Sequence, residues 1–178
     1  MNIWKGKIRM KRIAKFEKVS YERFKEDWLS KFKDCSQEEV LKIYEEIKLP
    51  KRATKGSAGY DIFAPDEIYL RPNQTITVPT GIRIYITEGW VFKIYPRSSL
   101  GFKYRLQLDN TVGIIDSDYY YSDNEGHLFV KITNCTNEEK ILVIPKKSGF
   151  AQGIFVQYGI TFDDEVTQIR NGGLGSTD

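Results

Sequence analysis

The sequence is poor in the residues that build most metal and thiol sites. Of its 178 residues one is histidine, His127, and two are cysteine, Cys35 and Cys135. A single histidine argues against a multi-histidine metal site and against a catalytic triad built on histidine. The cysteines lie far apart without a Cys-x-x-Cys spacing, so neither a disulfide framework nor a zinc site is indicated. We expect His127 itself to lie in solvent beside a loop.

Long apolar runs are absent too. No stretch approaches the roughly 18 apolar residues that a membrane helix needs. The start, MNIWKGKIRMKR, lacks the apolar core of a secretory signal. We therefore expect a cytoplasmic protein with no membrane partner. Walker sequences, dinucleotide fingerprints and His-Glu-x-x-His motifs are also missing.

Basic residues gather only near the N-terminus. Residues 1–52 carry 15 Lys and Arg against 9 Asp and Glu, whereas residues 53–178 carry 12 against 15. A nucleic-acid-binding face needs clustered basic residues. The one cluster, within residues 5–12, is typical of a solubilising tail. We expect no nucleic-acid partner.

The segment 20–47, after a possible strand at 13–19, has a helical period. Apolar residues recur at helical spacing in two runs, Phe24, Trp28 and Phe32, then Val40, Leu41, Ile43, Tyr44 and Ile47. Ser36 followed by Glu39 is a capping-box pattern that marks the start of the second helix. The segment therefore predicts a helical hairpin. Its apolar stripe favours packing on the main domain over binding a partner.

From Pro50 onward the apolar period changes to two. Short β-rich runs occur at 74–78, 82–86, 90–95, 128–133, 141–144 and 153–158, and turns rich in Gly, Pro and Asn separate them. Because no helical pattern lies between these runs, they predict an antiparallel sandwich, jelly roll or barrel and not a parallel sheet.

Three segments carry polar chemistry. Pro96–Gly101 places a guanidinium and two hydroxyls on one turn, which fits a phosphate cradle as well as an ordinary turn. Asp116 and Asp118 follow a neutral β-forming run, where a carboxylate acts as a general base, holds a divalent cation or simply lies in a solvated turn. The Gly-rich tail 170–178 is either a frayed end or an arm that orders over an anion.

In order along the chain, five motifs resemble those of the trimeric deoxyuridine triphosphatases, within the superfamily that also contains dCTP deaminase. They are AGYDI at 58–62, PRSSLG at 96–101, NTVGIIDSDY at 110–119, FAQ at 150–152 and RNGGLGST at 170–177. The resemblance covers residues 47–178. It implies an all-β distorted jelly-roll barrel, here with a short N-terminal helical hairpin insertion. The division that follows is 1–19 basic segment and first strand, 20–47 helical insertion, 48–169 jelly roll and 170–178 arm.

The resemblance also implies an activity, the hydrolysis of dUTP to dUMP and pyrophosphate. It implies a homotrimer with composite sites between subunits, and Mg²⁺ held mainly by substrate phosphates and not by direct protein ligands. Asp116 resembles the general base that activates the water attacking the α-phosphorus. Tyr119 resembles the residue packed under the deoxyribose, where its ring excludes a ribose 2′-hydroxyl. Asp61 resembles the residue that holds site water or Mg²⁺-bound water.

The remaining roles are carried over in the same way. Asn110, Gly113, Ile114 and Ile115 resemble the hairpin that pairs with the uracil edge. Arg97, Ser98, Ser99 and Gln152 resemble the phosphate-binding set. Residues of the tail resemble the arm that closes over the substrate, namely Arg170, Leu174, Gly175, Ser176 and Thr177.

The chain departs from the family pattern at several positions. Leu174 stands where a phenylalanine usually stacks on uracil, and the glycine run before it is one residue short. Gly149 replaces an arginine of the fourth motif. In our interpretation, the segment 120–125 lengthens the usually short link at the end of the hairpin after Tyr119 and thereby reshapes the rim of the pocket. The helical insertion modifies the trimer edge or binds a partner.

Two other functions stay open. The first is dCTP deamination on the same fold, which needs an acid/base carboxylate at the position where this chain has Lys131. The second is a non-catalytic nucleotide-binding regulatory paralogue that acts through a protein partner. Lys131, together with Asp116 and the Gly-Ser-Thr tail, favours hydrolysis over deamination. The presence of Asp116 and Tyr119 favours hydrolysis over the regulatory function.

Overall fold

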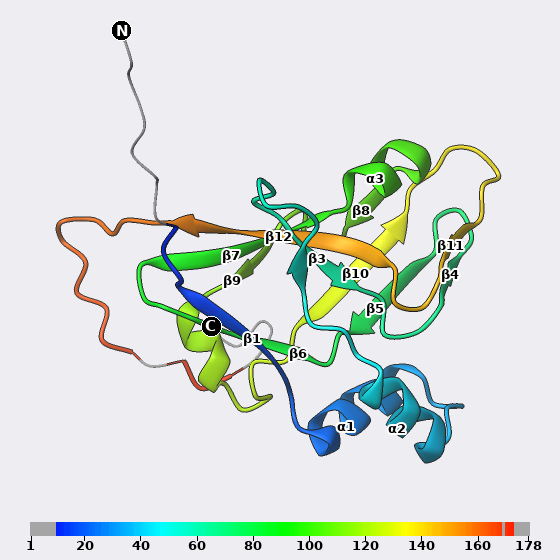
Figure 1. Cartoon of the computed structure of the whole chain (residues 1–178), viewed down its shortest axis with the longest axis horizontal. Coiled ribbons are helices and arrows are strands. Elements are labelled where there is room, and N and C mark those ends of the chain that lie inside the picture. The colour runs from blue at the N-terminus through cyan, green and yellow to red at the C-terminus, as the bar shows by residue number, and fades with distance from the viewer. Residues whose placement is uncertain (1–9, 169, 173–178) are drawn as a thin grey trace, which may run out of the picture.

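The computed structural model describes residues 10–168 and 170–172, and these form an antiparallel β domain with a helical hairpin at one end (Figure 1). The helices are α1 (Tyr21–Lys31), α2 (Gln37–Glu45) and α3 (Ser98–Tyr104), with a 3₁₀ turn η1 (Ser117–Tyr121). The strands are β1 (Ala14–Lys18), β2 (Lys51–Arg52), β3 (Tyr60–Phe63), β4 (Ile68–Leu70), β5 (Thr75–Pro79), β6 (Ile82–Ile86), β7 (Trp90–Pro96), β8 (Leu106–Leu108), β9 (Gly113–Ile115), β10 (Phe129–Asn134), β11 (Leu142–Ile144) and β12 (Gly149–Gln157).

The strands form four antiparallel sheets. The largest has the order β2-β3-β12-β7-β9, a second has the order β5-β10-β8, and two strand pairs join β1 to β6 and β4 to β11. The inward residues of neighbouring sheets, such as Phe92, Ile94 and Phe150 against Val130 and Ile132, are buried in one core. Alternate side chains of antiparallel strands point to one face, which is why the period-two pattern of the sequence produces this core. The predicted all-β jelly-roll class is confirmed.

The helical hairpin occupies the predicted place. Ser20 caps α1 by accepting a hydrogen bond from the Arg23 backbone N–H, and Ser36 and Glu39 form the predicted capping box at the start of α2. Phe24 and Trp28 are buried against the domain, as the helical period predicts. The predicted apolar face of the second helix included Leu41, but this residue is exposed in the structure.

Gly81 is the point where the hairpin docks on the sheet. This residue lies in the turn between β5 and β6 with φ +71°, a conformation that favours glycine. A Cβ atom there would lie 2.2 Å from Cδ1 of Ile47 and 3.1 Å from Cδ2 of Phe24. Only a residue without a side chain permits this approach, so the turn and the hairpin fit each other locally.

The structure corrects one expectation between the strands. The segment 96–101, predicted as a turn without helical pattern, contains the start of α3, and the C-cap residue after this helix, Arg105, lies in the left-handed region. Three polar residues and a glycine among its seven hide any apolar stripe, and none of the seven is buried. Within the described part of the chain, no helix is long and apolar enough to cross a membrane.

Candidate active site

Asp116 lies directly after β9, the edge strand of the largest sheet. Gly113 and Ile115 are buried while Ile114 points outward, and β9 pairs with β7 through Phe92 and Ile115. A Cβ at Gly113 would lie 3.2 Å from the Cβ of Ile94, so glycine lets the two strands approach closely here. Asp116 therefore lies at the end of this strand, and its carboxylate is 46% exposed.

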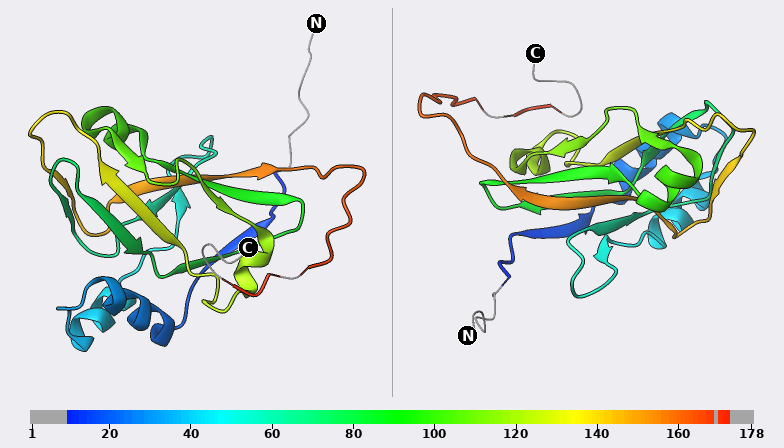
Figure 2. Two further views of the ribbon diagram at one scale, coloured as in Figure 1. Left: turned by 180° about the vertical axis from the view of Figure 1, so that it is seen from behind. Right: turned by 90° about the horizontal axis from the view of Figure 1, so that it is seen from above.

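Arg170 binds this carboxylate in the described structure. Its Nη2 donates a hydrogen bond of 2.8 Å to Oδ2 of Asp116, and its Nε lies 3.2 Å from Oδ1 of Asp118. The guanidinium carbon also lies 5.7 Å from the centre of the Tyr119 ring. The chain that follows β12 leaves the body and returns toward η1, which brings Arg170 to this place (Figure 2). We call these four residues the Asp116 cluster.

Tyr119 is the buried member of the Asp116 cluster. Its side chain is 4% exposed, and its hydroxyl donates to the backbone oxygen of His127 at 2.8 Å while accepting from Nδ2 of Asn124 at 2.9 Å. Burial raises the pKa of the Tyr119 hydroxyl, and the Asn124 hydrogen bond opposes that rise. Both hydrogen-bonding functions of the hydroxyl are occupied, so the ring has a fixed position.

A second cluster forms where β3, β12 and the end of β7 meet. Gln152 on β12 is the register partner of Asp61 on β3, and Nε of Arg97 lies 3.5 Å from Oδ1 of Asp61. The Arg97 guanidinium covers Gly149, since a Cβ built there would lie 3.4 Å from Nη1 of Arg97. We call Asp61, Arg97 and Gln152 the Arg97 cluster. Arg97 therefore occupies the space beside Gly149, the position where we expect the family pattern to have an arginine.

Other predicted residues lie on exposed surface near these clusters. Ser98 and Ser99 begin α3 and are exposed beside Arg97. Asn110 is exposed in the turn that joins β8 to β9. Leu174, Gly175, Ser176 and Thr177 lie outside the described residues, so of the predicted arm only Arg170 has a described contact.

Within one chain, the Asp116 cluster and the Arg97 cluster lie near opposite ends of β7. In the β7–β9 ladder Phe92 is opposite Ile115, which places Asp116 beside Val91, whereas Arg97 follows the other end of β7. At a rise of about 3.3 Å per residue, the stretch from Val91 to Arg97 spans about 20 Å. Within one chain, the backbone positions of the two clusters therefore lie about 20 Å apart along β7.

No group of three or more metal-ligating side chains gathers anywhere in residues 10–168 and 170–172. Mg²⁺ in proteins is often held by one or two carboxylates together with substrate phosphates. The Asp116 cluster has two carboxylates and the Arg97 cluster has one, Asp61, and these numbers fit that arrangement.

A family model described as dUTPase matches residues 45–178, which contain both clusters. The chain belongs to the dUTPase family. It is 43% identical over 134 residues to the deoxyuridine 5′-triphosphate nucleotidohydrolase of Lactococcus lactis, an alignment that covers 74% of this chain and 88% of that protein. The corresponding protein of Dictyoglomus turgidum is 35% identical over 147 residues, with 78% and 95% covered.

Solved structures agree with the family assignment. The dUTPase of Streptococcus mutans matches with a TM-score of 0.61 and 31% identity, over 82% of this chain and 97% of that one. A mutant dUTPase of Staphylococcus aureus phage phi11, solved with a structural Mg(II) ion, matches with a TM-score of 0.56 and 23% identity, over 70% and 92%. At that identity the second match supports the fold alone.

Sequence reasoning misplaced His127. Instead of lying in solvent it is 0% exposed, and it packs between α1 and the β5–β6 turn. The sequence contains one signal for the burial of His127. An apolar run begins at Leu128, directly after the histidine, and a residue next to a buried strand is often buried too. Its polar partners, on α1 and in a turn, are distant in sequence and carry no local signal.

Proposed function

We propose that the chain hydrolyses dUTP to dUMP and pyrophosphate with Asp116 as the general base. Its family makes it a dUTP nucleotidohydrolase. The observation that carries the mechanism is the half-exposed Asp116 carboxylate at the end of β9, next to a buried, fixed tyrosine. A carboxylate in this position accepts the proton of a water as that water attacks the α-phosphorus, and the O–P bond to the pyrophosphate breaks.

Arg170 has a second role in this proposal. It now binds Asp116 and Asp118, and a triphosphate carries more negative charge than these two carboxylates. Transfer of Arg170 to the γ-phosphate leaves Asp116 free for water and brings the arm over the substrate. The predicted role of the arm residues 174–177 stays part of this proposal.

Tyr119 is proposed to select the sugar. Because its hydroxyl is bound on both sides, the ring does not retreat when a ribose 2′-hydroxyl approaches. Steric exclusion by a fixed ring favours dUTP over UTP. The backbone of β9 from Gly113 to Ile115, with Asn110, is proposed to pair with the uracil edge.

The Arg97 cluster is proposed to hold the phosphates. Arg97, Gln152 and the exposed hydroxyls of Ser98 and Ser99 all donate hydrogen bonds that suit phosphate oxygens. Asp61 is proposed to hold water of the Mg²⁺ shell. When bound, Mg²⁺ neutralises charge on the phosphates.

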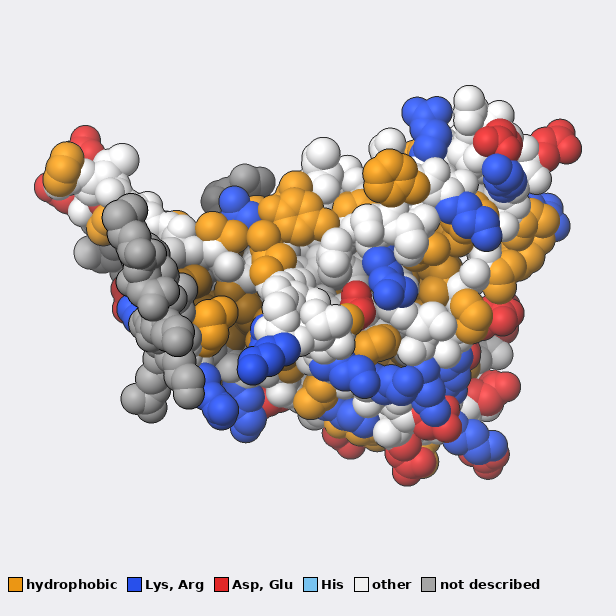
Figure 3. All heavy atoms as spheres, turned by 45° about the horizontal axis from the view of Figure 1, so that its top comes forward, with side chains coloured by type: hydrophobic (Ala, Val, Ile, Leu, Met, Phe, Trp, Pro, Cys, Tyr) orange, Lys and Arg blue, Asp and Glu red, His pale blue; other side chains and the backbone are white. Residues whose placement is uncertain are grey.

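A homotrimer with composite sites is proposed for two reasons. The separation of the clusters along β7 supports a site in which the Arg97 cluster of one subunit meets the Asp116 cluster of another. The segment after β12 also stands off the body with four exposed apolar residues, Tyr158, Ile160, Phe162 and Val166, as expected of chain that packs on a neighbour (Figure 3). The cytoplasmic location remains a prediction.

The test is to measure pyrophosphate and ammonia release side by side from dUTP, dCTP and UTP with Mg²⁺. We expect pyrophosphate from dUTP only. Ammonia from dCTP would instead establish a deaminase, although Lys131, at the position where that reaction needs a carboxylate, pairs with Asp109 at 2.9 Å. No product from any substrate would favour the regulatory paralogue.

A further inference from the structure

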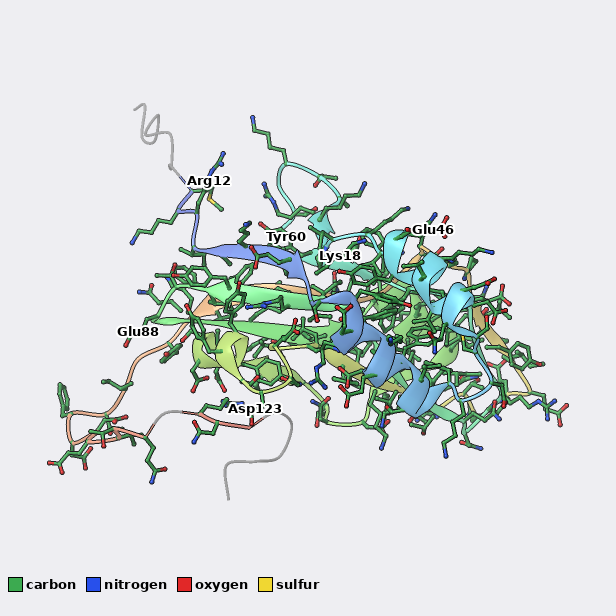
Figure 4. The ribbon with its side chains drawn as sticks, turned by 90° about the horizontal axis from the view of Figure 1, so that it is seen from below. Arg12, Lys18, Glu46, Tyr60, Glu88 and Asp123 are labelled. Atoms are coloured by element: carbon green, nitrogen blue, oxygen red, sulfur yellow. The ribbon has the colours of Figure 1, made fainter. Side chains whose placement is uncertain are left out.

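The helical hairpin and residues 120–125, which we predict from the sequence to be additions to the family pattern, contact each other. The backbone N–H of Ser20 donates to Oε2 of Glu125 at 2.7 Å, and the Ser20 hydroxyl donates to Oε1 at 2.6 Å. One carboxylate thus binds the N-cap residue of α1 through both oxygens. The loop that carries Asp123 lies between η1 and the start of α1 (Figure 4). The hairpin therefore holds the loop that follows Tyr119.

A second tie runs through His127. The backbone N–H of Gly81 donates to Nε2 of His127 at 2.7 Å, so Nε2 carries no proton in this arrangement. The proton of the neutral ring is then on Nδ1, which donates to Oδ2 of Asp27 at 2.6 Å. Asp27 lies on α1 and is 15% exposed, with Nη1 of Arg23 3.6 Å from its other oxygen. A partly buried carboxylate of the hairpin thereby fixes the tautomer and the plane of the ring.

The tie ends at the Asp116 cluster. His127 offers its backbone oxygen to the Tyr119 hydroxyl at 2.8 Å, and its backbone N–H donates to the backbone oxygen of Asn124 at 3.1 Å. Asn124 in turn donates to the same hydroxyl. Both partners of the Tyr119 hydroxyl therefore belong to the segment that Asp27 and Glu125 hold.

We propose that Asp27 is a positioning residue for sugar selection. Through His127, Asp27 sets where the Tyr119 ring stands, with Glu125 as a second anchor of the same loop. The hairpin is thus part of the apparatus that discriminates dUTP from UTP. This inference rests on the proposed role of Tyr119. Without the tie the hydroxyl loses a fixed partner, and the ring gains freedom to admit a 2′-hydroxyl.

The experiment compares Asp27→Ala, Asp27→Asn and the control Asp34→Ala, which removes an exposed carboxylate from the same hairpin. The measured quantity is the ratio of kcat/KM for dUTP to that for UTP. We expect Asp27→Ala to lower this ratio about five- to twentyfold. Asp27→Asn, whose amide oxygen still accepts from Nδ1, should recover most of the ratio, and the control should keep the wild-type ratio.

His127 supplies a second readout because it is the only histidine. Its ¹⁵N imidazole spectrum is therefore assigned without further labelling. We expect the single Nδ1–H tautomer in the wild type and a tautomer mixture in Asp27→Ala. In addition, Asp27→Ala and Tyr119→Phe should be non-additive in the ratio, since both act through the same hydroxyl.

Three outcomes decide the matter. An unchanged ratio in a folded Asp27→Ala protein, even with lower stability, would reduce the tie to a structural contact and overturn the inference. If Asp27→Ala does not fold, Glu125→Ala decides in the same assay, with a lowered ratio expected and an unchanged one contrary. An unchanged ratio in Tyr119→Ala would instead contradict the proposed role of Tyr119.

Discussion

The Asp116 cluster and the Arg97 cluster lie at opposite ends of β7 and are built in different ways. Tyr119 is buried and bound on both sides of its hydroxyl, whereas Arg97 is partly exposed and Ser98 and Ser99 are exposed. A fixed ring discriminates by shape, while flexible donors hold a flexible polyanion. In the proposed mechanism, the sugar is therefore selected by a ring that is already held in place in one chain, and the triphosphate is bound by exposed donors.

The largest expected effect is a difference in which kinetic parameter changes: kcat for a variant of the Asp116 cluster and KM for a variant of the Arg97 cluster. Asp116→Asn removes the base but keeps the shape, so kcat for dUTP should fall about 1,000-fold with KM little changed. Arg97→Ala removes a charged donor that binds phosphate, so kcat/KM should fall about 10- to 100-fold, mainly through KM. Steady-state pyrophosphate release measures both, and circular dichroism confirms that both variants fold.

Either reversal of this pattern would break the comparison. A near-normal kcat in Asp116→Asn would mean that another group accepts the proton. A loss in Arg97→Ala confined to kcat would place Arg97 on the reacting phosphate and not on the distant ones.

The next prediction concerns the distance between the clusters. In this experiment, the Asp116→Asn and Arg97→Ala proteins are mixed in equal amounts under conditions in which oligomers exchange subunits. If each site takes one cluster from each of two subunits, about one site in four is fully wild-type after random assembly. We therefore expect kcat/KM for dUTP, measured well below KM, to rise in the mixture to about a quarter of the wild-type value, above that of either variant alone.

The control is each variant taken alone through the same exchange, with native mass spectrometry to verify mixed oligomers. Mixed oligomers without recovered activity would place both clusters of a site in one chain. That result would contradict the composite site and require the chain around β7 to fold differently on binding.

The fold was predictable because its signals are local. Alternation at Ile82, Ile84 and Ile86 marks a strand with one buried face, and the Ser36–Glu39 capping box marks a helix start. The helix α3 was not predictable, because its seven residues have no buried face to impose a period. Its helical form depends on the surrounding fold.

The candidate site divides in the same way. The motifs identify Asp116, Tyr119 and Arg97 because each stands in a specific short pattern. The contact of Asp27 with His127 was not predictable, because it joins residues a hundred positions apart that have no motif of their own. The separation of the two clusters also needed the β7–β9 register, which no single strand reveals.

The smallest expected effect lies beside the Arg97 cluster, at Gly149. In Gly149→Ala the new Cβ would stand 3.4 Å from Nη1 of Arg97 and 3.5 Å from the Cβ of Asp61, which is ordinary van der Waals contact. KM for dUTP should therefore rise less than about threefold with kcat unchanged. Gly56→Ala, in open space, is the matched control. A rise in KM above tenfold would mean that the Arg97 side chain moves across Gly149 to reach the phosphates, and that the glycine provides the room for this movement. An unchanged KM would mean that Arg97 already stands where it binds the phosphates.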